Sequence, residues 1–376
     1  MLRFTGPLHF AVVAGLVLSG MSSQTALAQS GSSMDRTIGQ SMRIKPSSSR
    51  PVITSSDEDT NSSTNTRNSS PTRTQDMHHA GMWMFEYRYM HITQDGMLEK
   101  AKGVEPLSLI RNPGYVDANG RQVMMVPTDM TMDMHMLMGM YDVTNKLTVM
   151  AMGNFAQNDM NMVMQMMSGG ATEVTKMSSS GIADTQVGMM YKLDDLLLYN
   201  PILNVTLSIP TGGIDQKDDN GEVMPYEMQL GSGTYDLYTS LAMSNKFDMW
   251  DFGYEAGYLY HMCDNEQNYC WGNKLQLDAW LRYSFDFGTK IRGMITHAKW
   301  DTISGEDARI SANSMYAANP DYYGGMRSDF VLRVTQDFPW GLTGLVQVGV
   351  PLHQSLDGFQ LKTVYTMQAG VQWMFM

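Results

Sequence analysis

The feature that most constrains this chain is a hydrophobic pattern with a period of two, which recurs from residue 82 to the C-terminus. The segment KLQLDAWLRYSF at 274–285 has leucine, alanine and aromatic side chains at its odd-numbered positions and mostly polar side chains between them. The segments WMFEYRYMHI at 83–92 and SDFVLRVTQDF at 328–338 alternate in the same way. Because successive side chains of a β-strand point to opposite faces, this pattern predicts strands with one apolar and one polar face.

About twelve such segments can be counted along the chain, which predicts an all-β protein. We place them near residues 82–92, 129–141, 146–157, 181–192, 201–210, 233–244, 249–261, 273–286, 289–300, 327–338, 342–351 and 363–375.

The connections between these segments alternate in length. Residues 142–145, 245–248, 286–288 and 339–341 form short connections, whereas residues 93–128, 158–180, 211–232 and 301–326 form long ones. Long and short connections in alternation are typical of an antiparallel, up-and-down transmembrane β-barrel, here with about 12 strands. The last segment, TVYTMQAGVQWMFM, resembles a barrel-assembly signal, although it ends on Met376, one residue past the aromatic.

A secreted β-sandwich is the competing fold, because its strands alternate as well. The apolar face of a sandwich is a core rich in valine, isoleucine and leucine. A membrane barrel instead has an apolar exterior with aromatic residues at both membrane interfaces. Tyr254, Tyr258 and Tyr260 fit such an aromatic girdle, and the sequence therefore favours the barrel.

The N-terminal part of the chain has a different composition. Residues 1–28 have a basic start, a short apolar run and the sequence Ala26-Leu27-Ala28, which together predict a signal peptide cleaved after Ala28. Residues 29–76 are rich in serine, threonine and asparagine and are expected to be a disordered leader. Residues 77–376 then form the barrel, which we expect in the outer membrane of a Gram-negative bacterium.

The expected partners follow from the same observations. A barrel of this kind contacts outer-membrane lipid and needs the barrel-assembly machinery during biogenesis. No segment after the signal peptide has the run of about 20 apolar residues that a membrane helix needs. A net charge of -12 argues against nucleic acid, which requires a basic face.

The segment MTMDMHMLMGM at 130–140 has methionine at every even-numbered position, in a chain with 38 methionines among 376 residues. Burying a methionine side chain is favourable by about 1.5–3 kcal/mol. A cationic side chain near the middle of the lipid face costs roughly 2–4 kcal/mol. We therefore expect the methionine stripe to contact lipid and Asp133 and His135 to face the lumen. Binding of Cu(I), which thioether sulfur favours, is the alternative for this stripe.

Two further methionine clusters are candidates for soft or borderline metal ions. The first is MHHAGM at 77–82, where the ligands would be Met77, His78, His79 and Met82. The second is NDMNMVMQMM at 158–167, which we expect in an outer loop. The alternative for both is packing by adaptable methionine side chains.

Charged residues on the polar faces of the predicted strands are candidates for lining the pore. They either form a selectivity lining or a salt-bridge network inside the barrel, because buried charges must be paired in any case. The candidates are Glu86, Arg88, Asp133, His135, Asp184, Lys192, Asp236, Asp251, Glu255, Asp278, Arg282, Lys290, Arg292, Asp329 and Arg333.

The remaining chemical signals are weak. Cys263 and Cys270, seven residues apart in one predicted outer loop, are expected to form a disulfide in an oxidising compartment. GSGTYDL at 231–237 lacks the spacing of a nucleophile elbow. IDQKDDNGE at 214–222 resembles a calcium loop only faintly and is better explained as turn chemistry. The sequence thus predicts no enzyme and no cofactor.

Four stretches carry a resemblance to a known family. They are HHAGMWMFEYRYM, VPTDMTMDMHMLMGMYDVTNKLTVMAM, SGIADTQVGMMYKL and LSIPTGGIDQKDDNGEVMPYEMQLGSGTYDL. Together they resemble the outer-membrane transporter family known for the meta-pathway of phenol degradation, over most of residues 78–376. The resemblance implies transport of small, aromatic compounds.

These observations predict a barrel that acts as a passive channel or transporter for small, aromatic or hydrophobic molecules. Barrels of eight strands are filled by side chains and those of 16 to 18 strands hold an aqueous channel, so about twelve strands imply a narrow pore. Two alternatives remain open from the sequence. They are copper or other metal handling through the methionine and histidine clusters, and an enzyme embedded in the barrel.

Overall fold

The computed structural model of this protein describes residues 80–111, 124–165, 172–193, 201–263, 265–311 and 315–376. All of them belong to one compact unit, Glu58–Met376. Within these residues, no helix combines the length and the apolar character needed to cross a membrane.

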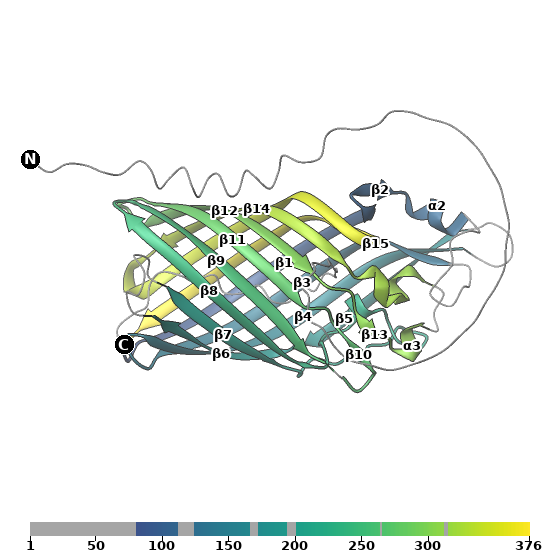
Figure 1. Ribbon diagram of the computed structural model, residues 1–376, viewed down its shortest axis with the longest axis horizontal. Coiled ribbons are helices and arrows are strands. Elements are labelled where there is room, and N and C mark those ends of the chain that lie inside the picture. Colours follow the sequence, from purple (N-terminus) through teal and green to yellow (C-terminus); the bar gives the residue numbers. More distant parts are fainter. Residues whose placement is uncertain (1–79, 112–123, 166–171, 194–200, 264, 312–314) are drawn as a thin grey trace, which may run out of the picture. The chain divides into compact units, whose positions relative to one another are not determined.

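The described residues form an antiparallel sheet that closes on itself (Figure 1). Strands that follow one another in sequence are neighbours in space, and β15 pairs with β1 to complete the ring. The main strands are β1 (Trp83–Lys100), β3 (Met125–Asp142), β4 (Leu147–Gln165), β5 (Thr172–Ile182), β6 (Thr185–Lys192), β7 (Ile202–Ile209), β8 (Tyr235–Phe247), β9 (Trp250–Met262), β11 (Lys274–Ser284), β12 (Thr289–Trp300), β14 (Gly325–Asp337) and β15 (Leu342–Phe375).

The long strand β15 is a hairpin that contributes two arms to the ring. Its residues up to Leu356 pair with β14, and those from Leu356 onward pair with β1. The side chain of Gln354 holds the arms together, since it bonds the backbone N–H and carbonyl of Thr363 at 3.0 and 2.8 Å. Gly358 supplies the positive φ of 66° that the turn requires.

The number of strands around the ring agrees with the sequence. Eleven strands close the ring if β15 is counted once and β2 (Lys102–Val104) and β5 are left aside. β5 and β6 pair with successive parts of β4 and occupy one position in the ring. With both arms of β15 the ring has twelve positions, and the predicted barrel of about twelve strands is confirmed.

The two ends of the barrel differ. Short turns and the C-terminus lie at one end, on the left in Figure 1. The long connections lie at the other end and carry α2 (Pro106–Arg111), η1 (Tyr226–Met228), β10 (Tyr269–Cys270), β13 (Ser304–Gly305), α3 (Ala308–Ser311), η2 (Tyr316–Ala318) and η3 (Pro320–Tyr322). A further single turn, η4 (Pro339–Gly341), joins β14 to β15 at the short-turn end.

Strands extend into two of the long loops expected from the sequence, which corrects that prediction. β1 continues to Lys100 and β4 to Gln165, so much of residues 93–128 and 158–180 belongs to the sheet. The reason lies in residues 158–165, NDMNMVMQ, where the alternation continues but asparagine and aspartate resemble loop composition. In the structure, Asn158 is buried inside and pairs across the strands with Met132, as a continuing strand requires.

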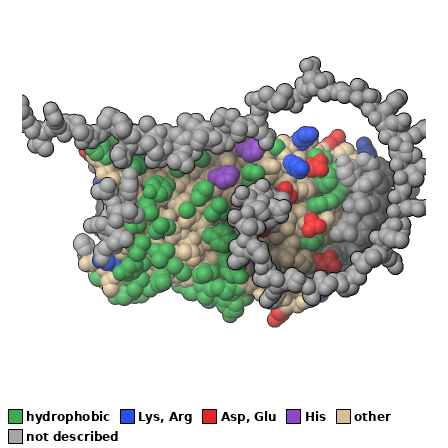
Figure 2. All heavy atoms as spheres, viewed as in Figure 1, with side chains coloured by type: hydrophobic (Ala, Val, Ile, Leu, Met, Phe, Trp, Pro, Cys, Tyr) green, Lys and Arg blue, Asp and Glu red, His purple; other side chains and the backbone are tan. Residues whose placement is uncertain are grey.

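The outer wall of the barrel is apolar. Trp83, Phe85 and Tyr87 on β1 are 42–48% exposed, whereas Glu86 and Arg88 at alternate positions are buried. Leucine, valine, isoleucine and aromatic side chains cover the outward positions of the other strands in the same way. In Figure 2 these side chains spread over the wall toward the short-turn end, and Lys, Arg, Asp and Glu gather at the end with the long connections.

Candidate functional site: a lumen with two unlike halves

One part of the inner wall is rich in methionine. Its side chains come from alternate positions of β1, β3, β4 and β6, where the period of two directs them inward. We call this surface the methionine half. It consists of Met84, Met90, Met134, Met136, Met138, Met140, Met150, Met152 and Met190, each at most 8% exposed, and packs with Ile92, Ala156, Ala183, Ile202 and Leu230.

The facing predicted for the stretch 130–140 is therefore wrong. Met134 and Met136 are buried inside the barrel, and Leu137 is 66% exposed on the outer wall. Asp133 and His135 share the outer face with Leu137 and do not line the lumen. The prediction compared only the cost of placing methionine or charge in lipid. It ignored that the odd positions of β3 lie opposite the aromatic outer residues Tyr87 and Tyr89 of β1.

Aromatic and histidine side chains on the outer wall supply partners for these two residues. The Tyr89 hydroxyl donates to the Asp133 carboxylate, and His91 Nδ1 lies 2.7 Å from the same carboxylate oxygen. The Tyr87 hydroxyl lies 2.8 Å from His135 Nδ1. Asp133 is thus held by two neighbours on β1, which reduces the cost of placing a carboxylate on the outer face.

The opposite part of the inner wall carries charged residues. These are inward-facing side chains of β8, β9, β11, β12 and β14, and we call them the charged half. The charged half consists of Asp236, Asp251, Glu255, Asp278, Arg282, Arg292, Arg327, Asp329 and Arg333. Glu86 and Arg88 of β1 form an ion pair with each other beside the methionine half. Asp184 lies between β5 and β6, where its carboxylate accepts from the backbone N–H groups of Gly212 and Ser232 at 2.9 and 2.8 Å.

Much of the charged half is organised in ion pairs. Arg282 Nη2 lies 3.0 Å from Asp251 Oδ2, and the indole N–H of Trp280 donates to the same carboxylate at 3.3 Å. Arg327 Nε lies 2.8 Å from Asp329 Oδ2. Pairing of this kind is what allows buried charges to persist. At the strand ends, Lys290 forms a further ion pair with Asp337 at 2.8 Å. His261 Nδ1 lies 2.8 Å from Asp236 Oδ1.

Three arginines follow one another across adjacent strands of the charged half. Arg282 is opposite Arg292, and Arg292 is opposite Arg333. The Arg292 guanidinium lies 5.2 Å from the ring centroid of Trp280 on β11. The Arg333 guanidinium donates from Nε to Gln347 Oε1 at 2.6 Å. Like charges on neighbouring strands repel, so a row of three cations favours an anion beside it.

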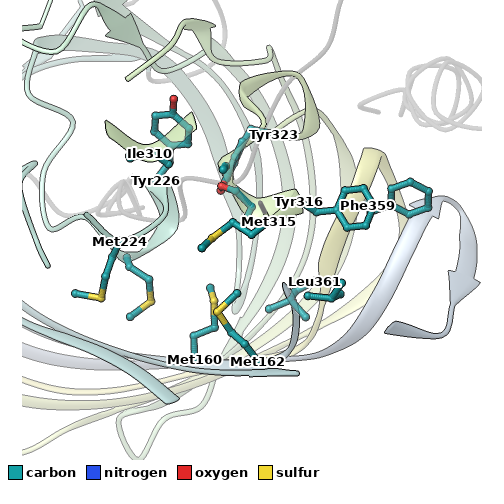
Figure 3. Close-up of a cluster of buried hydrophobic side chains, with 14 of the residues drawn as sticks. Met160, Met162, Met224, Tyr226, Ile310, Met315, Tyr316, Tyr323, Phe359 and Leu361 are labelled. Atoms are coloured by element: carbon teal, nitrogen blue, oxygen red, sulfur yellow. The ribbon is translucent and has the colours of Figure 1, made fainter. Parts of the chain in front are cut away.

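The end of the lumen with the long connections is filled by an apolar group that we call the mouth cluster. It joins residues from loops 210–234, 263–273 and 301–324 to those parts of β1, β3, β4 and β15 that lie near the long connections. Figure 3 shows Met160 and Met162 pointing from the barrel wall toward Met315, with Tyr226 and Tyr323 on the far side. All five are at most 2% exposed.

Tyr226 lies at the centre of the mouth cluster and makes edge-to-face contacts with neighbouring aromatic rings. Its ring centroid lies 4.9 Å from that of Tyr269 and 5.5 Å from that of Tyr323. Its hydroxyl accepts the backbone N–H of Asp307 at 2.9 Å, which connects loops 210–234 and 301–324. Beside it, burial raises the pKa of Glu227 to about 7.

A disulfide anchors the loop that carries Tyr269. Cys263 and Cys270 are joined, with their Cα atoms 5.2 Å apart. By the loop-entropy estimate a staple of this size contributes about 2–3 kcal/mol.

The remaining candidates from the sequence are distributed as follows. Met77, His78 and His79 lie outside the described residues, and Met82 is partly buried just before β1. Met160 and Met162 lie on a strand, which contradicts their expected place in a loop. Lys192 ends β6.

Among the described residues, no group of three or more His, Cys, Asp or Glu side chains is placed to hold a metal ion. Asp218 accepts the N–H groups of Asn220 and Glu222, both at 2.9 Å, which is ordinary turn chemistry.

Sequence reasoning did not find the mouth cluster. Its aromatic residues lie in segments without periodicity, so no pattern assigns them to a face. The available signal was composition, because Tyr226, Tyr269 and Trp271 are large apolar side chains in segments expected to be solvated loops.

Comparisons with known proteins agree with this fold. A family model described as "Putative MetA-pathway of phenol degradation" matches residues 116–321, which is more than half of the 376 residues. The crystal structure of an outer membrane channel from Pseudomonas putida F1 is similar, with a TM-score of 0.55 and 16% identity over 82% of this chain and 100% of that chain. The P. putida toluene transporter TodX has a TM-score of 0.41 and 10% identity over 78% of this chain and 89% of that chain. No curated protein matches the sequence.

Proposed function

Because the chain belongs to the family described as "Putative MetA-pathway of phenol degradation" and has the fold of an outer membrane channel, we propose that it is an outer-membrane channel for small aromatic or hydrophobic molecules. The observation that carries the proposal is the methionine half. An apolar strip inside a membrane barrel gives such solutes a surface to follow, and flexible thioether side chains adapt to rings of different shape.

The charged half would act on the same solutes from the opposite side. A small aromatic molecule that carries a hydroxyl or carboxylate group has one apolar and one polar part. The methionine half contacts the ring, and the row Arg282, Arg292 and Arg333 attracts the polar or anionic group. The two halves together favour amphipathic aromatic solutes over purely apolar ones.

We infer that the protein moves its solute without transforming it. Several carboxylates of the lumen lie in ion pairs with arginine, as for Asp251 with Arg282 and Asp329 with Arg327. Such pairs give the carboxylates a structural role in the wall.

The mouth cluster controls entry in this proposal. Tyr226 lies at its centre and joins two of the loops that cover the lumen. A passing solute must displace or loosen these loops, so the channel is expected to have closed and open states.

The test is single-channel recording of the purified full chain in planar bilayers. Tyr226→Ala removes the central ring of the mouth cluster and should raise the open fraction and the conductance. Phenol should reduce the current through this variant in a saturable manner, whereas glycerol at the same concentration should not. The control is Tyr235→Ala, a tyrosine that is 52% exposed on the outer wall, which should behave as the unaltered protein.

Two results would remove the proposal. One is a Tyr226→Ala variant that folds in the bilayer and conducts no ions. The other is a current that phenol and glycerol reduce equally.

A further inference from the structure

Four methionines occupy directly neighbouring positions across four adjacent strands at the short-turn end of the lumen. Met374 on β15 is opposite Met84 on β1, Met84 is opposite Met140 on β3, and Met140 is opposite Met150 on β4. The last three are buried at 3–5% exposure, and Met374 is partly buried and packs against the cluster to which they belong. We call this set the four-methionine row.

From this geometry we propose that the four-methionine row binds a soft monovalent metal ion, Cu(I) or Ag(I). The proposal goes beyond the channel function and does not depend on it.

The spacing suits shared coordination. Directly opposite residues of antiparallel strands have Cβ atoms about 4.5–5.5 Å apart and point to the same face. A methionine side chain has three rotatable bonds, so neighbouring sulfur atoms can converge on one ion without a shift of the backbone. Two or three adjacent thioethers of the row can thus provide the sulfur environment that suits Cu(I).

The choice of residue supports a role for the sulfur. Where this barrel needs only apolar surface, on its outer wall, it uses mainly leucine, valine, isoleucine and aromatic residues. Those side chains would fill the inner wall with better-defined rotamers than methionine. The four-methionine row instead places a thioether at each of four consecutive cross-strand positions.

The neighbouring positions favour a cation without competing for it. The next inward row contains Gln372, Glu86, Met138 and Met152. The Glu86 carboxylate contributes a negative charge on the same face as Met84, although its ion pair with Arg88 moderates the field. Met138 and Met152 add a second pair of thioethers one step further into the lumen. An ion released from the row would thus meet further sulfur ligands.

The experiment measures metal binding to the full chain purified in detergent. Ag(I) serves as a probe that does not change its oxidation state, and Cu(I) is titrated without oxygen against a chromophoric Cu(I) chelator. The test variant is Met84→Leu/Met140→Leu/Met150→Leu, which keeps side-chain volume and apolar character and should fold. The matched control is Met189→Leu/Met262→Leu/Met326→Leu, which changes three methionines that are 39–44% exposed.

We expect the unaltered protein and the control to bind Ag(I) and Cu(I) alike. The test variant should lose the tightest site, with affinity reduced by about tenfold or more. The single variant Met140→Leu, which removes one central ligand, should show a smaller loss. X-ray absorption at the copper edge should show a shell of sulfur neighbours that disappears in the test variant.

The proposal is overturned if the test variant and the control bind metal equally, or if the unaltered protein binds neither ion. A metal shell of nitrogen or oxygen atoms would likewise assign the ion to other ligands. Because binding is measured at equilibrium in detergent, a failure of the channel to conduct phenol leaves this result unaffected.

Discussion

The two halves of the lumen share one backbone design and differ in how they hold their side chains. In the methionine half, the side chains pack against one another through contacts that have little directional preference. In the charged half, ion pairs such as Arg282 with Asp251 fix each group in one position. The comparison shows how one barrel can contain an adaptable wall and a rigid wall. The adaptable wall tolerates changes of shape, and the rigid wall tolerates few changes of charge.

The largest expected effect tests whether the methionine half really faces inward. Leu137 and Met138 are adjacent on β3 and point to opposite sides. Leu137→Arg places a cation on the lipid face and should impair folding into lipid vesicles by roughly 2–4 kcal/mol. Met138→Arg places the cation opposite Glu86 and should cost less.

Urea titration of folding into lipid vesicles measures both variants. If Met138→Arg proves the more damaging change, the methionines contact lipid and the division into two halves fails.

The second prediction concerns the mouth cluster, which includes Met160 and Met162 of β4. The pKa of Glu227 is raised from 4.5 to about 7, so its carboxyl stays protonated in the packed loop while it ionises in an unpacked one. Stability of the packed loop is therefore lost as the pH rises from about 4.5 to 7, by up to about 3 kcal/mol, and changes little above that range.

Hydrogen exchange of residues 223–230 should accordingly become faster between pH 5 and pH 8, after correction for the intrinsic rate. Glu227→Gln should remove most of this pH dependence and leave the β-strands unchanged. Equal pH dependence in the variant would assign the effect to another group.

The third prediction addresses the rigidity of the charged half. Asp251→Asn keeps the shape of the side chain but removes the charge that Arg282 contacts at 3.0 Å. We expect a loss of about 1.5–3 kcal/mol in the free energy of unfolding. The double variant Asp251→Asn/Arg282→Gln should recover part of that loss, because no unpaired charge then remains. Additive losses in the two single variants and the double variant would show that the pair does not act as a unit.

The smallest expected effect belongs to the methionine half. Met134→Leu keeps the volume and apolar character of a buried side chain and should change stability by less than about 1.5 kcal/mol. The same urea titration in lipid vesicles provides the measurement. A larger loss would show that the methionine half is packed as specifically as the charged half, and the contrast between them would disappear.

The sequence was sufficient for most of the strands and their order. Period-two alternation located the main strands except β5, most of which was assigned to a long connection. The alternation is readable because an outer face in lipid and a different inner face leave a strong local signal. The facing of β3 could not be obtained from that strand alone. One face of β3 carries methionine, and the other carries Leu137, Asp133 and His135. Either face could contact lipid when the strand is considered alone. Only the register with Tyr87 and Tyr89 on the neighbouring strand decides between them.

The candidate site was predicted in part for a similar reason. Charged residues such as Asp278 and Arg292 alternate with apolar ones, and the pattern alone directs them inward. The row of arginines and the four-methionine row depend on which residues of separate strands lie opposite one another. That information is set by hydrogen-bond register over distances that no local pattern encodes.

The unequal length of the strands has a consequence for how the molecule is stabilised. β1, β3 and β4 have 18, 18 and 19 residues, whereas β6 and β7 have eight each. A bilayer is crossed by about 9–11 residues, so the long strands continue well beyond the lipid and meet the loops of the mouth cluster there. The two ends of the barrel are therefore in different environments, lipid at one end and water at the other. The part of the barrel toward the short-turn end responds to the thickness and composition of the bilayer. The end with the mouth cluster is stabilised by burial of apolar side chains away from water, as a soluble domain would be.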